Sequence, residues 1–331
     1  MAPKTPRTIY FRGRNEEILE RISVLKRNYF VLEKLSARGV FRVFDPEAGP
    51  QGNYRLLYRI PQSLMTREKI DLWNRLSGSQ KNRNFPALLD FGKADSDFIL
   101  VTEWIEGTNL RDYLEAVRNR DTPRPTPREV VRLIRGLVHG VAHYYRRTQL
   151  VHGDISPANL ILTTGTSQLI VIDFGSAWPI ETGDRVETTE GITIPYAAPE
   201  RLHPDAPVDF RADFFSVAVV AYEMLTLTIP YAGLGGQAGL PMLIKKTATA
   251  YHPPSTIISH AGRLPRQTIQ FMDDCLSQSL RLVPEERYAT LADWLSAWDQ
   301  LHHSFQKGSR LRRIDEWILG GLNRLLRLLG R

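Results

Sequence analysis

The sequence predicts an α+β protein built from two lobes, a small lobe rich in antiparallel β-strands and a larger, mainly α-helical lobe. Up to about residue 105, apolar residues alternate with polar ones or form short groups between turn-rich segments, which is typical of strands. Beyond Gly107, long stretches repeat apolar residues every three or four positions, which is typical of helices. A chain of 331 residues without internal repeats is long enough for two such lobes with complete cores.

The small lobe is predicted to contain strands on both sides of one main helix. Residues 29–60 hold three apolar segments separated by turn material such as DPEAGPQGN, which predicts a three-stranded antiparallel meander. Residues 66–76 place three apolar side chains on one helical face. Residues 85–105 predict two further strands, joined by the polar turn KADSD.

The larger lobe is predicted to be helical wherever the apolar spacing persists. The predicted helices cover residues 110–117, 127–148, 213–227, 267–279 and 291–302. Ahead of the small lobe, the spacing of Ile18, Ile22 and Leu25 predicts one more helix over residues 16–25, packed on that lobe.

Most of the positive charge lies at the two ends of the chain. The sequence has 43 basic and 36 acidic side chains for a net charge of +7, yet residues 1–30 carry +4 and residues 306–331 carry +5, so the 275 residues between them carry −2. The basic ends lack interleaved aromatic residues and any nucleic-acid-binding motif, so we expect no nucleic-acid partner. We divide the chain into a basic extension (1–27), a small lobe (28–104), a larger lobe (105–303) and a basic C-terminal helix (304–331).

Cysteine usage and hydropathy predict a cytoplasmic protein. The single cysteine, Cys275, excludes an intramolecular disulfide and a cysteine-based zinc site, and indicates a reducing compartment. The N-terminal segment has no apolar core typical of a signal peptide. No stretch reaches the roughly 20 apolar residues that a membrane-spanning helix needs.

The residues suited to catalysis lie in two short segments, HGDISPAN at 152–159 and IDFG at 172–175. Asp154 is placed to orient and deprotonate a hydroxyl group. Asn159 and Asp173 supply the hard oxygen ligands that Mg²⁺ prefers when it also holds phosphates. Each motif alone is ordinary turn chemistry. Together, with Asn159 and Asp173 14 residues apart between apolar strands, they favour a catalytic site.

These motifs, in this order, make the chain similar to the protein kinase superfamily, and in particular to the eukaryotic-like (Hanks-type) Ser/Thr kinases. The similarity covers about residues 28–302 and includes the family's His-Arg-Asp loop, its Asp-Phe-Gly motif and its Ala-Pro-Glu motif at 198–200. The resemblance implies a bilobal protein-kinase-like fold and transfer of the γ-phosphoryl group of ATP to a Ser or Thr hydroxyl of a protein, with Mg²⁺ or Mn²⁺. It also implies structural roles for Asp213, which would hold the catalytic loop, and for a Glu200–Arg287 pair.

The resemblance implies a role for each matching residue. Asp154 is similar to the catalytic base, Asn159 and Asp173 to the metal ligands, and Thr193 to a residue that contacts the catalytic loop. The implied ATP-binding positions are Val43, Leu57 and Arg59 in the small lobe, the backbone of Glu103 and Ile105 in the hinge, and Ile161 in the larger lobe.

The small lobe departs from the family where ATP is held. With the Gly-x-Gly-x-x-Gly-x-Val loop anchored on Val43, bulkier residues obstruct the backbone N–H groups that must approach the phosphates. The replacements for the three glycines are Ser36, Arg38 and Phe41. In the next strand Leu57 replaces a small Ala and Arg59 replaces a Lys, whose compact ammonium a planar guanidinium does not reproduce. Counted back from Leu76, the helical position that faces Arg59 is Lys69, which would repel it, whereas a shift of one residue gives an Arg59–Glu68 pair.

The catalytic loop has two substitutions of its own. Ser156 stands where Ser/Thr kinases place a Lys that contacts the transferred phosphate, and losing one such charge costs on the order of 3 kcal/mol of transition-state stabilisation. Gly153 replaces the Arg that grips a phosphorylated activation loop. Activity is therefore expected to depend less on phosphorylation of Thr188 or Thr189.

Three functions are compatible with a chain that retains the catalytic-loop residues but lacks the usual ATP-binding residues. The first is an active but atypical Ser/Thr protein kinase, and the second is a pseudokinase that serves as a binding or scaffolding module. The third is a small-molecule phosphotransferase, which the loop HGD suits but the Ala-Pro-Glu segment and Arg287 disfavour. Retention of Asp154, Asn159 and Asp173 together favours the active kinase.

The C-terminal residues 310–331 predict a basic amphipathic helix with one apolar stripe. Such a helix suits a peripheral membrane contact, docking in a partner's groove, packing on the body of the chain, or a homodimer contact. Asp315, Glu316 and the Gly320–Gly321 pair weaken the membrane interpretation, so we favour packing on the body or on a second copy.

Overall fold

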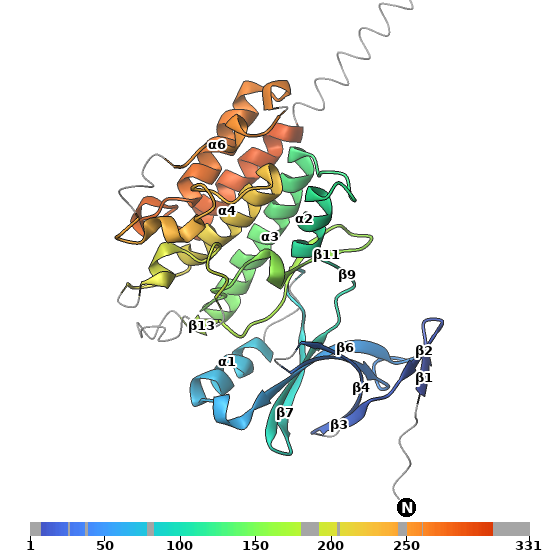
Figure 1. Ribbon diagram of the computed structural model, residues 1–331. Helices are drawn as coiled ribbons and strands as arrows, with labels where there is room; N and C mark the ends of the chain where they lie inside the picture. The colour runs from blue at the N-terminus through green and yellow to red at the C-terminus, as the bar shows by residue number, and fades with distance from the viewer. Residues whose placement is uncertain are drawn as a thin grey trace, which may run out of the picture. The chain divides into compact units, whose positions relative to one another are not determined.

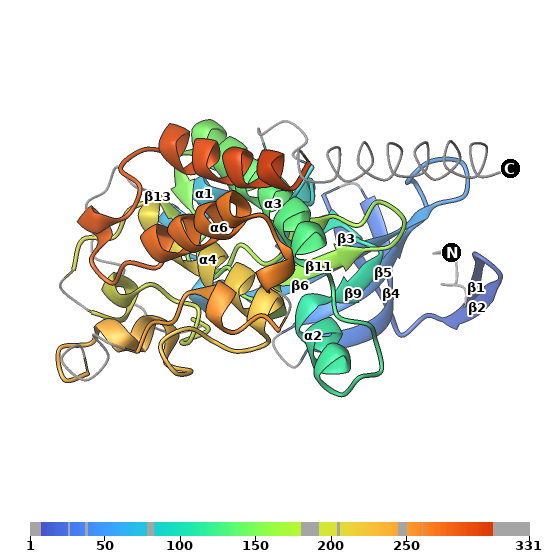
Figure 2. The same ribbon diagram turned by 90° about the horizontal axis from the view of Figure 1, so that it is seen from above.

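The structure is a computed structural model that describes residues 8–25, 27–36, 39–77, 83–179, 192–203, 206–243, 250–259 and 261–306 (Figures 1 and 2). It divides into two compact units, Met1–Gly107 and Thr108–Arg331. Three predictions lie outside the described part of the chain: those for Arg38, for Thr188 and Thr189, and for residues 310–331. The side chains of Glu68 and Lys69 are likewise not described.

The first unit is built on a six-stranded antiparallel sheet, as the alternating sequence pattern predicted. In spatial order its strands are β3 (Glu20–Val24), β4 (Arg27–Ser36), β5 (Val40–Asp45), β6 (Asn53–Pro61), β8 (Asp97–Glu103) and β7 (Leu88–Ala94). The predicted meander is β4 to β6, and the two strands joined by KADSD are β7 and β8. The predicted helix is α1 (Arg67–Ser77), which lies against β7, and the short 3-10 helix η1 (Gln62–Leu64) precedes it.

The sheet curves so strongly that β3 and β7, the two ends of the strand order, contact each other (Figure 1). The Tyr29 hydroxyl on β4 donates a 2.7 Å hydrogen bond to Asp90 on β7 across this closure. The apolar side chains on the enclosed face form a core that comprises Ile22, Val24, Tyr29, Val31, Val43, Leu57, Ile99 and Val101. Burial of this core holds the first unit together.

The helix predicted over residues 16–25 is wrong, because this segment is extended. β2 (Arg14–Glu17) pairs with β1 (Thr8–Phe11) in a separate hairpin, and β3 joins the main sheet beside β4. Ile22 and Val24 are buried and alternate with exposed residues, which is the period of a strand. The apolar spacing from Ile18 to Leu25 also fits a helix, but pairing with β4 satisfies the backbone and buries the two apolar side chains in the core.

The second unit is mainly helical, as predicted. Its helices are α2 (Leu110–Arg118), α3 (Pro127–Thr148), α4 (Arg211–Thr226), α6 (Arg266–Ser279) and a final one over residues 291–306. Its short strands form one sheet from β9 (Gly107–Asn109), β11 (Leu160–Thr163) and β12 (Leu169–Val171), and another from β10 (Leu150–Val151) and β13 (Trp178–Pro179). Its 3-10 turns are η2 (Pro157–Asn159), η4 (Pro199–Leu202), η5 (Gly235–Gly239), η6 (Pro254–Thr256), η7 (Ala261–Arg263) and η8 (Pro284–Glu286).

Helix α4 is the centre of the second unit, between α3 and α6 (Figures 1 and 2). Every side chain from Ala212 to Thr226 is buried. Phe214 stacks on Trp294 of the last helix with ring centroids 4.0 Å apart. Cys275 is buried on α6, and burial raises the pKa of its thiol. Among the described residues, no helix has the length and hydrophobicity that crossing a bilayer would require.

Candidate active site

The loop that carries the catalytic motif begins where α3 ends. Gln149 closes α3 in the left-handed conformation with φ 56°, and β10 then leads into residues 152–159. The backbone N–H groups of His152 and Gly153 each donate a 2.9 Å hydrogen bond to the Asp213 carboxylate. Asp213 lies in the first turn of α4 and is 3% exposed, so the central helix fixes the backbone of the loop. The expected structural role of Asp213 is confirmed.

The Asp154 carboxylate is held by one neighbour on each oxygen. Its Oδ2 accepts a 2.6 Å hydrogen bond from the Asn159 amide, and its Oδ1 accepts a 2.8 Å bond from the Thr193 backbone N–H. The Asn159 amide also donates to the Asp154 backbone carbonyl at 2.9 Å. Burial raises the pKa of Asp154, whereas the hydrogen bonds from Thr193 and Asn159 act in the opposite direction. The result is an oriented carboxylate with a pKa above its ordinary value.

Ser156 and Thr193 join the same network. The Thr193 hydroxyl donates a 3.2 Å hydrogen bond to the Ser156 hydroxyl, which is fully buried. Residue 193 thus contacts the catalytic loop through both its backbone and its side chain. Ser156 consequently serves to connect the loop to the segment that contains Thr193.

Asp173 follows β12 after one intervening residue, Ile172, and adopts the left-handed conformation with φ 67°, which is uncommon for a residue with a side chain. Its Oδ1 accepts a 2.9 Å hydrogen bond from the Gly175 N–H. The next residue towards β12, Ile172, donates a backbone bond of 2.8 Å to the Asn159 carbonyl. The Asp173 charge also contributes to the raised pKa of Asp154, so the two carboxylates lie within electrostatic range of each other.

Asn159 and Asp173 suit a hard divalent cation. Asn159 donates both of its hydrogen bonds to Asp154 through Nδ2, so its Oδ1 is the atom suited to a metal. Within the described ranges, no group of three or more His, Cys, Asp or Glu side chains forms a metal site. A Mg²⁺ ion at this place would take its protein oxygens from this pair, with nucleotide phosphates among the other ligands.

Trp178 lies against Gly153, and Arg201 lies over the Trp178 ring; neither residue was predicted from the sequence. Gly153 has φ 76°, and a Cβ at this position would lie 1.9 Å from a ring carbon of Trp178. The guanidinium of Arg201 lies 4.3 Å from the centroid of the Trp178 ring. Burial lowers the pKa of Arg201, whereas the charges of Asp213 and Asp154 act in the opposite direction. The only feature of the sequence that could have predicted this contact is Gly153, because a glycine leaves space that another side chain can fill.

The Glu200–Arg287 pair forms as expected. The two guanidinium nitrogens of Arg287 contact the two oxygens of Glu200 at 2.5 and 2.8 Å, and both side chains are almost completely buried. Arg287 also donates to the backbone carbonyls of Arg211 and Arg281. This buried pair connects the Ala-Pro-Glu segment to α4 and to the turn before the last helix.

The ATP-binding positions predicted in the first unit already have protein partners. Val43 and Leu57 are 0% exposed members of the core on the enclosed face of the sheet, which also includes Ile22 and Val24 of β3. Arg59 contacts Glu20 of β3 at 2.8 Å and Asp97 at 3.9 Å. Arg59 is thus occupied by two carboxylates within its own unit.

The three remaining positions that were predicted to bind ATP, Glu103, Ile105 and Ile161, are half-buried. The Glu103 backbone N–H donates a 3.0 Å bond to the Ala87 carbonyl, and its side chain accepts a 3.1 Å bond from the Ala87 N–H. Ile105 follows β8 and is half-buried. Ile161 lies on β11 of the second unit and is also half-buried.

Comparison with known proteins agrees with this geometry. A family model described as "Protein kinase domain" matches residues 66–297. The chain is 27% identical over 230 residues to serine/threonine-protein kinase PknB of Mycobacterium tuberculosis, covering 66% of this chain and 34% of PknB. It is 26% identical over 223 residues to serine/threonine-protein kinase PknD of Chlamydia abortus, covering 60% of this chain and 22% of PknD. The chain thus spans about a third or less of the length of these relatives.

Solved structures show the same fold. The crystal structure of the PknI kinase domain of Mycobacterium tuberculosis aligns with a TM-score of 0.55 and 20% sequence identity. The alignment covers 82% of this chain and 96% of that domain. The predicted fold class, an antiparallel sheet in the small lobe and a helical larger lobe, is confirmed.

Proposed function

Because the chain belongs to the protein kinase domain family, we propose that it transfers the γ-phosphoryl group of ATP to a Ser or Thr hydroxyl of a protein. The observation that carries this proposal is the network around Asp154, whose two oxygens are oriented by Asn159 and Thr193. Such a network holds a general base in a fixed position in the loop that follows α3 and β10. The named relatives, PknB and PknD, are serine/threonine-protein kinases.

Each residue has a defined task in this proposal. An Asp154 carboxylate oxygen orients the acceptor hydroxyl and accepts its proton, and burial favours this because it raises the pKa of the acid. Asn159 and Asp173 hold Mg²⁺ or Mn²⁺, which neutralises charge on the phosphates of ATP when bound. Asp213 keeps the loop backbone in place through its two hydrogen bonds.

Trp178 and Arg201 support a loop that needs no phosphate to become ordered. In this chain the indole ring occupies the space into which a side chain at position 153 would extend. A buried guanidinium within electrostatic range of Asp213 and Asp154 supplies positive charge from inside the unit. We therefore expect activity without phosphorylation of Thr188 or Thr189.

A second candidate function, a pseudokinase that binds partners, is favoured by the core of the first unit. Val43 and Leu57 are fully buried in the same core as Ile22 and Val24 of β3, so their side chains offer no exposed surface to adenine. Arg59 pairs with Glu20 instead of a phosphate. The small-molecule phosphotransferase is disfavoured, because the buried Glu200–Arg287 pair supports a platform for a peptide substrate.

Phosphoryl transfer tests the first proposal. Purified full-length chain is incubated with radiolabelled ATP, Mg²⁺ or Mn²⁺, and casein as acceptor. Asp154→Asn and Asp173→Asn should each lower the initial rate by about 10²- to 10⁴-fold, because each removes a carboxylate from the reaction centre. Asp112→Asn, at an exposed position of α2, is the matched control and should leave the rate unchanged. Equal labelling by wild type and both active-site variants would contradict the kinase proposal.

Thermal unfolding with ATP separates the two candidates. A ligand that binds only the folded state at 100 times its Kd raises the free energy of unfolding by about 2.7 kcal/mol. The kinase proposal predicts such a shift with ATP and Mg²⁺, reduced in Asp173→Asn. If millimolar ATP does not raise the unfolding temperature and no phosphoryl group is transferred, the pseudokinase proposal is favoured.

A further inference from the structure

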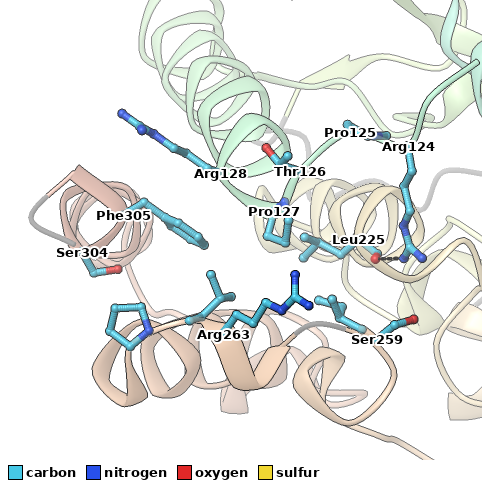
Figure 3. Close-up of a pocket in the computed structure, with 13 residues that line it drawn as sticks. Arg124, Pro125, Thr126, Pro127, Arg128, Leu225, Ser259, Arg263, Ser304 and Phe305 are labelled. Carbon is cyan, nitrogen blue, oxygen red and sulfur yellow. Dashed lines mark hydrogen bonds between the residues drawn. The ribbon is translucent and has the colours of Figure 1, made fainter. Parts of the chain in front are cut away.

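A pocket of about 620 Å³ opens at the N-terminal end of α3 (Figure 3). It is formed by the segment before α3, the last turn of α4, the segment around η7 and the end of the last helix. This volume lies within the range of about 300–1,000 Å³ that is typical of ligand sites. The catalytic loop follows the other end of α3, whose 22 residues span about 33 Å. The pocket is therefore distinct from the candidate active site.

The floor of the pocket is apolar. Leu225 and Phe305 line the pocket and are only 3% and 7% exposed. The other apolar side chains in the lining are Pro125, Pro127, Ile258, Leu264 and Pro265. A ligand that fills this floor gains free energy by removing apolar surface from water.

Three arginines and no carboxylate line the same pocket among the residues that the structure describes. Figure 3 shows the Arg263 side chain extending into the pocket, and the Arg124 guanidinium reaching the Leu225 carbonyl, to which it donates a hydrogen bond. Arg128 lies at the rim on the first turn of α3 and is exposed. Arg124 is exposed, and partial burial of its side chain lowers the pKa of the guanidinium, so an anionic partner beside it would be favoured.

We propose that this pocket binds an acidic peptide segment of a partner protein, with a large apolar side chain in the floor and carboxylates beside Arg124, Arg128 and Arg263. Charge excludes the chain's own C-terminal residues 306–331 as the preferred occupant, because they carry +5. If the proposed kinase activity holds, about ten extended residues would link the docked segment to a phosphoacceptor at Asp154. Binding itself does not depend on that activity.

Fluorescence anisotropy tests the docking without ATP. The probe is a fluorescein-labelled peptide of sequence Glu-Leu-Glu-Phe-Asp-Leu-Glu, titrated with the full-length chain at low salt. Saturable binding is expected, and Arg128→Glu and Arg263→Glu should each weaken it at least tenfold. Arg147→Glu, exposed at the opposite end of α3, is the matched control and should bind like wild type. A peptide with Lys in place of every acidic residue should not bind.

Several outcomes would overturn the docking proposal. One is an absence of saturable binding up to millimolar peptide, and another is equal binding by wild type and both pocket variants. Displacement of the probe by a synthetic peptide of residues 309–331 would identify the chain's own tail as the occupant. Displacement by micromolar dodecanoate, with no competition from unlabelled acidic peptide, would identify a fatty carboxylate instead.

Two controls keep the test clear. Arg128 is exposed on the helix surface, so Arg128→Glu remains informative if Arg263→Glu fails to fold. Asp154→Asn should bind the probe with wild-type affinity, because it lies at the other end of α3. Loss of phosphoryl transfer in Asp154→Asn with intact docking would separate the two proposals, and failure of either one would leave the other standing.

Discussion

At the scale of single residues, Gly153 shows why the loop at residues 152–159 needs a glycine. Its φ of 76° lies in the left-handed region, and the Trp178 ring occupies the place of a Cβ. The indole ring in turn contacts the Arg201 guanidinium. A loop position that usually carries an arginine side chain is thus stabilised here by packing from β13 and η4.

Gly153→Ala should lower the free energy of unfolding by about 1–3 kcal/mol, because it forces both a strained backbone and a shift of the Trp178 ring. Urea denaturation followed by circular dichroism would measure this change. Gly136→Ala is the control: Gly136 lies within α3, where an added Cβ meets nothing within 4 Å. That substitution should stabilise the protein by about 0.5–1 kcal/mol. Equal effects of the two substitutions would show that Trp178 does not fill this space.

Asp213 makes a pH-dependent contribution to stability. Burial raises its pKa from 3.8 to about 6, although the two hydrogen bonds that it accepts from backbone N–H groups act to lower the pKa. The folded state therefore holds the proton more tightly than the unfolded state, so the contribution to stability is present at low pH and is lost as the pH rises from about 4 to 6. Relative to Asp213→Asn, the wild type should lose about 2 kcal/mol of unfolding free energy between pH 4 and pH 7. Urea denaturation of both proteins at each pH measures this difference, and a difference independent of pH would contradict the assignment.

At the scale of elements, structure that is fixed by local sequence was predicted correctly, whereas structure that depends on long-range strand pairing was not. Helix α3 has the bounds that the sequence predicted, because Thr126 and Glu129 form a capping box that fixes its start. Residues 16–25 were predicted as a helix, yet they form β2 and β3, because β4 provides a partner strand for β3 that the local spacing does not reveal. Pairing between strands is a tertiary property, and a single sequence carries little information about it.

The candidate site shows the same division. Asp154, Asn159 and Thr193 were predicted from their motifs, and the structure brings them into one hydrogen-bond network. Trp178 and Arg201 were not predicted, because their contact joins β13 to η4 and has no sequence spacing of its own. Burial of Leu57 beside β3 was likewise missed, since it depends on the strand that was read as a helix.

Leu57→Ala distinguishes a core residue from a nucleotide contact. Leu57 is a fully buried member of the core, so Leu57→Ala should lower the free energy of unfolding by about 2–5 kcal/mol. Leu19→Ala, at a position that is 61% exposed, is the matched control and should change stability by less than about 0.5 kcal/mol. Chemical denaturation measures both effects. A nearly neutral Leu57→Ala with tighter ATP binding would instead place Leu57 in a nucleotide pocket.

At the scale of the whole molecule, two compact units imply two cooperative unfolding units. Hydrogen exchange followed by mass spectrometry should therefore show that Leu57→Ala raises exchange mainly in β3 to β8. Glu200→Gln breaks a buried ion pair, which typically costs about 3–5 kcal/mol, and should raise exchange mainly in α4 and α6. Exchange raised equally throughout the chain by either variant would show a single cooperative unit.

The buried position of Cys275 allows fluorescent dyes to be attached selectively to introduced surface cysteines. The only thiol of the chain is buried on α6, and its raised pKa keeps it protonated and unreactive at neutral pH. A maleimide dye would therefore react with an introduced surface cysteine and leave Cys275 unlabelled in the native state. One such cysteine in each unit would carry a donor and an acceptor dye without removal of any natural residue. Single-molecule fluorescence could then follow the two units while nucleotide or an acidic peptide is added.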